Sequence, residues 1–420
     1  MPDRPGSGGG TGVPVPTLAA LALAYAVAPL ATDMYLPAFP RMMHDLRTGA
    51  TGVQLTLTAF MTGLAVGQLV IGPLSDRWGR RRPMLAGTAV SVLAGLLCAL
   101  APSLELLVAA RFVQGFSGAA GIVIGRAVVS DRAAGGGTAR SFGILMITGG
   151  VAPVVAPLVG GALVGPLGWR GIFLVLAGLA ALMFAGVFLL VPESLPLPLR
   201  HGGGLAATFR TLRALPADRY FTGYASAYGF GFGVLFAYIA ASPFVFQNFY
   251  GLSKGTYAVV FAVNAFGFTA TSAVNRRLVG RFGPRPLLRV GLTVMVSCCA
   301  LLCALTSTDR LPLGAAAGLI FGSASSLGLV AANATALATA RAPHAAGSAS
   351  AVLGALQFGL AALVAPLVGL SGEGTPLPMA MAMLASAGVA CLGGLLLARA
   401  GRASPAGVEA DRPSGHRRLS

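Results

Sequence analysis

The stretch that decides the fold class is Gly72-Pro73-Leu74-Ser75-Asp76-Arg77-Trp78-Gly79-Arg80-Arg81-Arg82-Pro83, which separates two long apolar runs. Glycines and prolines, one acid and four arginines are concentrated in it. Arginine-rich loops beside apolar helices stay on the cytoplasmic side of a membrane. The stretch therefore predicts a short cytoplasmic hairpin between two membrane-spanning helices.

The composition of the whole chain agrees with a membrane protein. Its 420 residues are 55% hydrophobic and only 10% charged, with a mean hydropathy of +0.80. A helical span needs about 20 apolar residues to cross a bilayer, and twelve runs satisfy that length. We expect an all-α membrane protein with twelve transmembrane helices, at residues 16–36, 52–72, 83–101, 106–129, 141–164, 170–191, 221–245, 256–274, 286–306, 311–337, 347–369 and 377–399.

An internal repeat divides these spans into two halves. Arg281-Phe282-Gly283 repeats Arg77-Trp78-Gly79, with Gly280 in the place of Asp76. The polar stretch 192–219 lies between the sixth and seventh spans, so we expect two pseudo-symmetric six-helix bundles. The expected domains are a disordered cytoplasmic tail at 1–15, bundles at 16–191 and 220–399, a cytoplasmic linker at 192–219 and a second disordered tail at 400–420.

The net charge of +17 reflects membrane topology rather than nucleic-acid binding, although basic chains often bind nucleic acid. On one side of the membrane the loops and tails carry 22 basic residues, whereas the other side has only Arg41, Arg47, Arg170, Lys254 and Arg310. By the positive-inside rule both termini are cytoplasmic. We expect the protein to contact the lipid bilayer and to bind no nucleic acid.

Nothing in the sequence indicates an enzyme, a metal site or a cofactor. The five cysteines lie in apolar runs without metal-ligand spacing, and no phosphate-binding Gly-x-x-x-x-Gly-Lys loop is present. We therefore expect no catalytic residues.

Asp33 is the only acid that we place inside a span. An ionisable side chain in hydrocarbon costs about 2.5–3.5 kcal/mol, so it needs a partner, water or a function. Burial disfavours the charged form of a carboxyl group, which lets it load and release a proton. Our hypothesis is that Asp33 binds a coupling proton; the alternative is an acid at the outer mouth, bonded to loop backbone.

Two arginines fall within the fourth span. Arg111 and Gln114 are three residues apart and share a helical face, so Arg111 points into the bundle or reaches an interface. A functional role for Arg111 stands against a packing role through backbone hydrogen bonds. For Arg126 we expect an ion pair with Asp131.

The fifth span contains prolines and paired glycines, at Gly149, Pro153, Pro157, Gly160 and Gly161. Such residues release backbone groups and allow a bend and close helix contact. We expect a functional role for this span, and the alternative is an ordinary transmembrane helix with a kink.

In the opening stretch, Asp76 is expected to meet helix N-termini or an arginine such as Arg132 or Arg140. With Gly72, Arg77, Gly79 and Arg80 it would form a conformational latch. Arg80, Arg81 and Arg82 would also face anionic lipid as topology determinants.

Polar and aromatic residues within the spans are candidates for contact with a small-molecule substrate, although each could equally join helices. They are Tyr25, Gln68, Gln114, Tyr228, Tyr238, Asn264, Asn333 and Gln357.

Three of these features resemble motifs of the major facilitator superfamily. The opening stretch matches its pattern Gly-x-x-x-Asp-Arg-x-Gly-Arg-Arg at every position. Arg111-Phe112-Val113-Gln114-Gly115 is similar to a second motif, whose arginine is implicated in proton transfer. The resemblance implies that Arg111 takes part in proton coupling together with Asp33. The fifth span resembles the antiporter motif, with Ala156-Pro157 where the pattern has Gly-Pro.

Further segments resemble the bicyclomycin and chloramphenicol/florfenicol resistance branch, Bcr/CflA. They are residues 33–40, 241–251, 261–264 and 347–358. The resemblance implies a drug:proton antiporter of the bacterial inner membrane that exports small, mainly hydrophobic drugs by alternating access, and we expect a monomer. A nutrient or metabolite symporter and a non-transporting membrane sensor are the alternatives.

Overall fold

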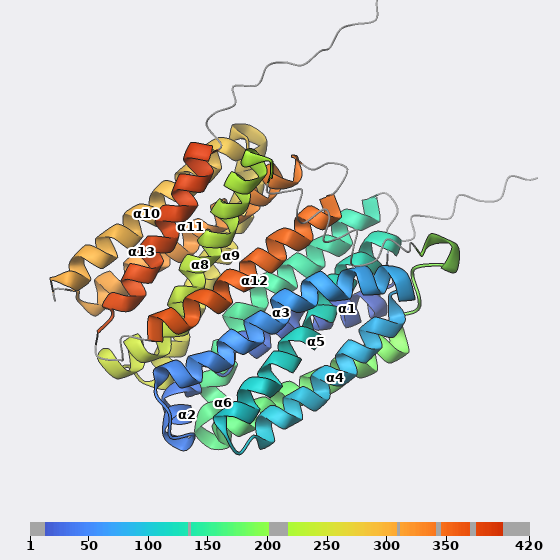
Figure 1. The fold of residues 1–420 in the computed structure, drawn as a ribbon, viewed down its shortest axis with the longest axis horizontal. Helices are drawn as coiled ribbons and strands as arrows, with labels where there is room; N and C mark the ends of the chain where they lie inside the picture. The colour runs from blue at the N-terminus through green and yellow to red at the C-terminus, as the bar shows by residue number, and fades with distance from the viewer. Residues whose placement is uncertain are drawn as a thin grey trace, which may run out of the picture.

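The protein is described from a computed structural model, which covers residues 13–132, 136–200, 217–308, 311–341, 346–369 and 375–397. These residues are almost entirely helical, and the helices run side by side in two groups (Figure 1). The predicted second tail and most of the predicted first tail and linker lie outside the described residues.

The first group runs from α1 to α6. It comprises α1 (Val15–Asp33), the short segments η1 (Leu36–Ala38) and α2 (Phe39–Asp45), and the long helices α3 (Ala50–Trp78), α4 (Arg81–Leu100), α5 (Leu104–Arg132) and α6 (Gly136–Leu190). Gly168, with φ at 65°, interrupts α6, so α6 is two consecutive helices that turn at this glycine. They are the predicted fifth and sixth spans.

The second group follows a short 3₁₀ segment, η2 (Leu197–Leu199). It comprises α8 (Arg219–Pro243) with the π-helix η4 (Phe244–Phe249), α9 (Lys254–Phe282), α10 (Pro284–Ser307), α11 (Leu313–Thr339), α12 (Ala346–Gly369), and α13 (Leu377–Leu392) with the π-helix η6 (Gly393–Leu397). Within the described part of the chain, eleven segments are long and apolar enough to cross a membrane. Because the segment at Ser141–Leu190 is two helices, the twelve predicted spans are each matched.

The predicted ends of the spans are less accurate than their number. We expected a loop at residues 73–82, between the second and third spans, but α3 continues through Pro73 to Trp78, and α4 begins at Arg81. Because lipid offers no hydrogen-bond partners, backbone near the membrane stays helical despite turn-forming residues. Asp76 and Arg77 therefore lie in the last turn of α3, and the turn itself is only Gly79 and Arg80.

The repeat predicted from the sequence is present in the backbone. Gly79 ends α3 with φ 87° and ψ 168°, and Gly283 ends α9 with φ 75° and ψ 167°. Both are in a conformation that a side chain disfavours, so equivalent turns join equivalent helices in the two bundles.

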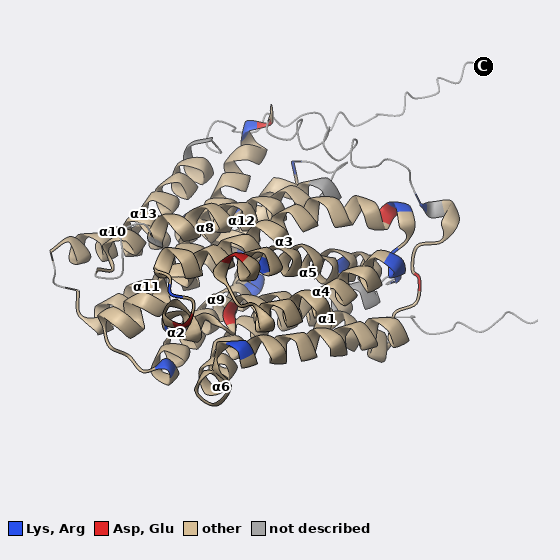
Figure 2. Cartoon of the chain, turned by 60° about the horizontal axis from the view of Figure 1, so that its bottom comes forward, with Lys and Arg blue, Asp and Glu red and all other residues tan. Residues whose placement is uncertain are grey.

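The two bundles meet along two pairs of helices. The helix α3 packs against α12, and the first half of α6 packs against α9. At one end of the molecule, Gln54 Nε2 donates a hydrogen bond to the carbonyl oxygen of Ala240, at 3.0 Å. The Phe39 and Phe244 rings lie 5.8 Å apart at the same end. Charged residues are sparse along the helices, and a few of them lie on helix segments in the middle of the molecule (Figure 2).

Candidate functional site

Arg111 lies in the interior of the first bundle, where no part of it is exposed. Its position depends on close packing of α3 and α5. A Cβ on Gly115 would overlap the carbonyl oxygen of Phe60, and a Cβ on Gly63 would overlap that of Phe112. Only glycine lets the two backbones approach in this way, and the approach brings Phe60 against the guanidinium.

Aromatic rings surround the Arg111 guanidinium. Its central carbon lies 4.1 Å from the centre of the Phe60 ring and 4.5 Å from that of Tyr35, with Phe173 at 5.6 Å. Such cation–π contacts are worth about 2 kcal/mol or more when desolvated. Arg111 also donates a hydrogen bond to Gln114 Oε1 at 2.7 Å. The expected shared face of Arg111 and Gln114 is therefore present.

The other nitrogens of Arg111 are less well satisfied. Within the described part of the chain, Nε and NH2 have no hydrogen-bond partner, and no carboxylate forms an ion pair with this arginine. The cation is stabilised mainly by ring faces. A backbone-bonded packing role, the alternative considered above, has no hydrogen bond to support it here.

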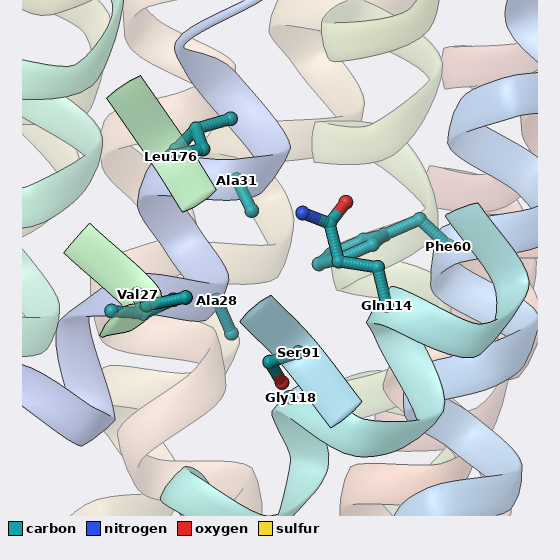
Figure 3. Close-up of a pocket in the computed structure, with 9 residues that line it drawn as sticks. Val27, Ala28, Ala31, Phe60, Ser91, Gln114, Gly118 and Leu176 are labelled. Carbon is teal, nitrogen blue, oxygen red and sulfur yellow. The ribbon is translucent and has the colours of Figure 1, made fainter. Parts of the chain in front are cut away.

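A small cavity borders this arrangement. It is lined by Gln114, Phe60, Ser91 and small residues of α1, and the Gln114 amide points toward Ala31 (Figure 3). Its volume of about 10 Å³ is room for roughly one water molecule. It is too small to hold a substrate.

Asp33 is the last residue of α1 and is 4% exposed. Its Oδ1 has no hydrogen-bond partner among the described residues, and no backbone group there bonds the carboxyl. The apolar segment continues through η1 and α2 to Asp45, so Asp33 lies within a span of 31 residues rather than at its end. The carboxyl is close enough to Tyr238 and Tyr257, from the second bundle, to interact with them electrostatically.

The fifth span packs directly against the end of α1. A Cβ on Gly160 would overlap the carbonyl oxygen of Met34, the residue after Asp33. A Cβ on Gly149 would lie 2.6 Å from Cε1 of Tyr25. The close helix contact expected of these glycines is present, on the face toward α1.

The other face of the same helix contacts the second bundle. A Cβ on Gly161 would lie 2.9 Å from the Cβ of Ala258, and Thr269 Oγ1 donates to the carbonyl oxygen of Gly150 at 2.9 Å. Pro153 and Pro157 lie inside the helix, whose backbone leaves helical angles only at Gly168. The helix thus connects the end of α1 to α9.

The candidate polar residues fall into separate groups. Tyr228 Oη donates to Gln357 Oε1 at 2.6 Å, and Asn264 Nδ2 donates to Tyr238 Oη at 2.9 Å. Asn333 instead bonds Asn275 within the second bundle, at 2.7 Å, where both are buried. Gln68 packs against Gly354 of α12, at the contact between bundles.

The predicted ion pair between Arg126 and Asp131 is wrong. Arg126 donates to Tyr25 Oη, and its guanidinium carbon lies 5.2 Å from the centre of the Tyr25 ring. Five residues on a helix are turned by about 140° from each other, so the two side chains leave on different faces. Asp131 instead accepts from Arg80 Nε at 3.0 Å and from Ser194 Oγ at 2.9 Å.

The turn after α3 is held by a cluster centred on Arg80. This arginine donates to Asp76, to Asp131 and to Ser75 Oγ, the last at 2.8 Å. Arg80 is 9% exposed, so the prediction that it faces lipid is wrong. Asp76 does pair with an arginine, as expected, but that arginine is Arg80. Arg132, one of the two arginines named as candidates, instead donates to the carbonyl oxygen of Glu193, at 3.4 Å. The Arg140 side chain lies outside the described residues.

Other residues of the expected latch make fewer contacts with the cluster around Arg80. Arg77 is exposed, and Gly72 has ordinary contacts, its carbonyl oxygen accepting from Ser75 Oγ at 2.8 Å. Arg81 does not simply face lipid either, because its side chain donates to the carbonyl oxygens of Val191 and Phe188.

Sequence analysis missed Glu193, which joins this cluster from beyond the sixth span. Its carboxylate accepts the backbone N–H of Arg80 at 2.8 Å and that of Arg81 at 3.3 Å, and it lies 3.6 Å from Arg200. Desolvation raises the pKa of Glu193, but hydrogen bonds from the Leu195, Arg80 and Arg81 N–H groups and the charge of Arg200 together hold it below its usual value. An acid directly after an apolar run, facing arginine-rich loops, was the available signal.

The sequence from residue 21 to residue 366 matches the Major Facilitator Superfamily. This chain belongs to that superfamily.

Two superfamily proteins are similar over most of the chain. The uncharacterized MFS-type transporter YdgK of Bacillus subtilis is 39% identical over 382 residues, which are 90% of this chain and 94% of YdgK. The bicyclomycin resistance protein homolog of Haemophilus influenzae is 31% identical over 357 residues, 84% of this chain and 89% of that protein. The resemblance to the Bcr/CflA branch is confirmed, and the chain is a transporter rather than an enzyme.

A solved superfamily structure has the same fold. The bacterial homolog of the human lysosomal transporter Spinster, in an inward-facing and occupied conformation, has a TM-score of 0.71. The match covers 93% of this chain and 98% of that one, at 18% identity. The predicted all-α fold with two six-helix bundles is confirmed.

Proposed function

We propose that this superfamily member exports small, mainly hydrophobic drugs or antibiotics in exchange for protons, by alternating access. The drug class is supported by the relative named for bicyclomycin resistance, with which the chain shares 31% identity. Exchange for protons is supported by the position of Asp33.

The observation that carries the proposal is a buried carboxyl group at the contact between bundles, which has no counter-charge in the described part of the chain. An ionised carboxylate in such a place is costly unless it is paired and hydrogen-bonded. Asp33 has no described partner on Oδ1 and interacts electrostatically with Tyr238 and Tyr257 of the other bundle. A change in the distance between the bundles therefore changes the surroundings of this carboxyl, and with them its affinity for a proton.

Alternating access requires the bundles to rock about the contacts between them. The contacts of α3 with α12 and of α6 with α9 are the surfaces on which this motion occurs. Small residues such as Gly150 and Gly161 leave the contact between α6 and α9 without bulky side chains on the α6 side. The Arg80 cluster is the proposed latch, since it ties the ends of α3, α5 and the sixth span together on one side.

The arginine-rich loops support an orientation with both termini in the cytoplasm, in the inner membrane of a bacterium. We propose that the unit of transport is a monomer, because both bundles belong to one chain. The substrate would pass between the bundles, next to Tyr25, Tyr228, Gln357, Tyr238 and Asn264.

The test uses purified protein in sealed liposomes, with chloramphenicol and bicyclomycin as probes. An imposed pH gradient should drive drug movement opposite to the protons. The variant Asp33→Asn should lose this coupled movement, while Glu105→Gln, which changes an exposed acid on α5, should behave as the wild type. Full gradient-driven transport by Asp33→Asn would contradict the assignment of the coupling site, and movement of drug with the protons would identify a symporter.

A further inference from the structure

Arg126 is a second arginine inside the bundles, and it differs from Arg111 in keeping an exposed surface. It lies about four-fifths of the way along α5, yet its side chain remains open to solvent, whereas Arg111 is fully enclosed. An arginine that is exposed part-way along a buried helix must border water or lipid. The ring of Tyr25 and the nearby Tyr228, which belong to the two bundles, place it between them.

Within the described residues, no carboxylate compensates the charge of Arg126. Among the described residues it takes part in no ion pair, and Asp131 is engaged by Arg80 and Ser194. Asp33 follows Tyr25 by eight residues on α1, a rise of roughly 12 Å. A cation inside a membrane protein without a protein counter-ion marks a site for an ion or a substrate.

The groups around Arg126 present donors rather than acceptors. Tyr25 Oη accepts a hydrogen bond from Arg126, so the hydroxyl hydrogen of Tyr25 is left to donate elsewhere. Gln357 Oε1 accepts from Tyr228, and the Gln357 amide N–H groups form no hydrogen bond within the described part of the chain. Three side chains from α1, α5 and α12 thus offer N–H or O–H groups and one positive charge.

We propose that Arg126, Tyr25 and Gln357 form an anion-binding subsite between the bundles, and that the exported molecules include ones that carry a carboxylate or another compact anionic group. The guanidinium holds the anion by charge and by hydrogen bonds, and the Tyr25 and Tyr228 rings contact an apolar body. The inference rests on the proposed function in placing substrate between the bundles.

The subsite gives Arg126 and Asp33 separate roles. An anionic group that binds at Arg126 completes the missing ion pair there and leaves Asp33 free to exchange its proton. A positively charged ligand gains nothing at this point, because it meets a cation and donor groups. The site therefore selects anionic and neutral molecules over cationic ones of the same size.

The experiment measures binding without any proton gradient, so its outcome is separate from that of proton exchange. The probes are 1-naphthoate, its neutral amide and 1-naphthylmethylamine, which share one apolar body and differ in charge. Ligand-induced thermal stabilisation of the protein in detergent gives a dissociation constant for each. We expect the carboxylate to bind the wild type most tightly and the amine most weakly.

The decisive variants are Arg126→Gln and Arg126→Lys, with Arg281→Gln as the control. Arg126→Gln should weaken naphthoate binding about tenfold or more while leaving amide binding within about twofold. Arg126→Lys should keep the preference for the carboxylate, because it keeps the charge. Arg281→Gln removes an exposed cation at the end of α9 and should change nothing.

Two results would overturn the proposal. One is a wild type that binds the carboxylate no better than the amide, whether both bind or neither does. The other is an Arg126→Gln protein, monodisperse in detergent and stabilised normally by the amide, that keeps the full preference for the carboxylate.

Discussion

The Nε atom of Arg80 lies 3.0 Å from Oδ2 of Asp131, so the turn after α3 is fastened to the last turn of α5. The two residues are 51 positions apart in the sequence. Glu193 adds a third attachment through the backbone N–H groups of Arg80 and Arg81. One end of the first bundle is therefore held by a partly buried charge cluster rather than by apolar packing alone.

Removing Arg80 should destabilise the protein more than removing its neighbour Arg82. The variant Arg80→Gln leaves Asp131 with only Ser194 and should lower the free energy of unfolding by roughly 1.5–3 kcal/mol, the usual worth of hydrogen bonds to charged groups. Arg82 is exposed, so Arg82→Gln should have little effect. Denaturant titration in mixed micelles gives both values, and equal losses would show that the cluster contributes nothing specific.

Glu193 should make stability depend on pH in the acid range. The pKa of its carboxyl is lowered in the folded protein, because N–H groups and Arg200 outweigh desolvation. Glu193 therefore contributes its full stabilisation above the pKa that a glutamate has in the unfolded chain, about 4.3. That stabilisation is lost as the pH falls through the lowered pKa of the folded protein. The melting temperatures of wild type and Glu193→Gln should differ at neutral pH and converge below about pH 4. A gap that stays constant with pH would contradict this account.

Gly160 should tolerate no side chain. In Gly160→Ala the new Cβ overlaps the Met34 carbonyl oxygen, so α1 and α6 must separate beside Asp33. Overpacking of this kind costs about 1–3 kcal/mol, and we expect drug export to fall as well. Resistance in a pump-deficient bacterium and the melting temperature measure the two effects. Gly165→Ala is the control, since a Cβ there meets nothing within 4 Å; matching phenotypes for the two variants would remove the steric explanation.

Arg111 should not be replaceable by lysine. The planar guanidinium stacks on Phe60 and Tyr35 and bonds Gln114, whereas an ammonium group cannot stack in this way. Arg111→Lys should lose about 2 kcal/mol of stability from the desolvated ring contacts. Arg170→Lys changes an exposed stack on Trp169 and should cost less. Thermal unfolding in detergent compares them, and an Arg111→Lys protein as stable as the wild type would disprove the requirement for a planar cation.

Sequence predicted those parts of the fold that the bilayer itself dictates. The length and apolar character of each span follow from membrane thickness, so the number of spans was predictable. The shared face of Arg111 and Gln114 follows from helical periodicity. Helix ends were harder to place: α3 continues to Trp78 past a Gly-Pro pair, because nothing near the lipid competes for its backbone hydrogen bonds.

Partners that are distant in sequence could not be predicted. Arg126 was assigned to Asp131, five residues away, whereas its partner Tyr25 lies 101 residues away on another helix. Glu193 reaches Arg80 over 113 residues. Such pairs depend on how the helices are arranged around one another, and local spacing carries no information on that arrangement.

The matching turns at Gly79 and Gly283 have a consequence for how this molecule arose. If one ancestral segment was copied, the copies kept the same backbone bend while their chemistry diverged: the first copy has Asp76 where the second has Gly280. Both copies kept the shape of the turn, whereas among the described residues the charged cluster around Arg80 is found at the first copy. Building an equivalent charged cluster into the second copy would therefore test whether a more symmetric protein still transports.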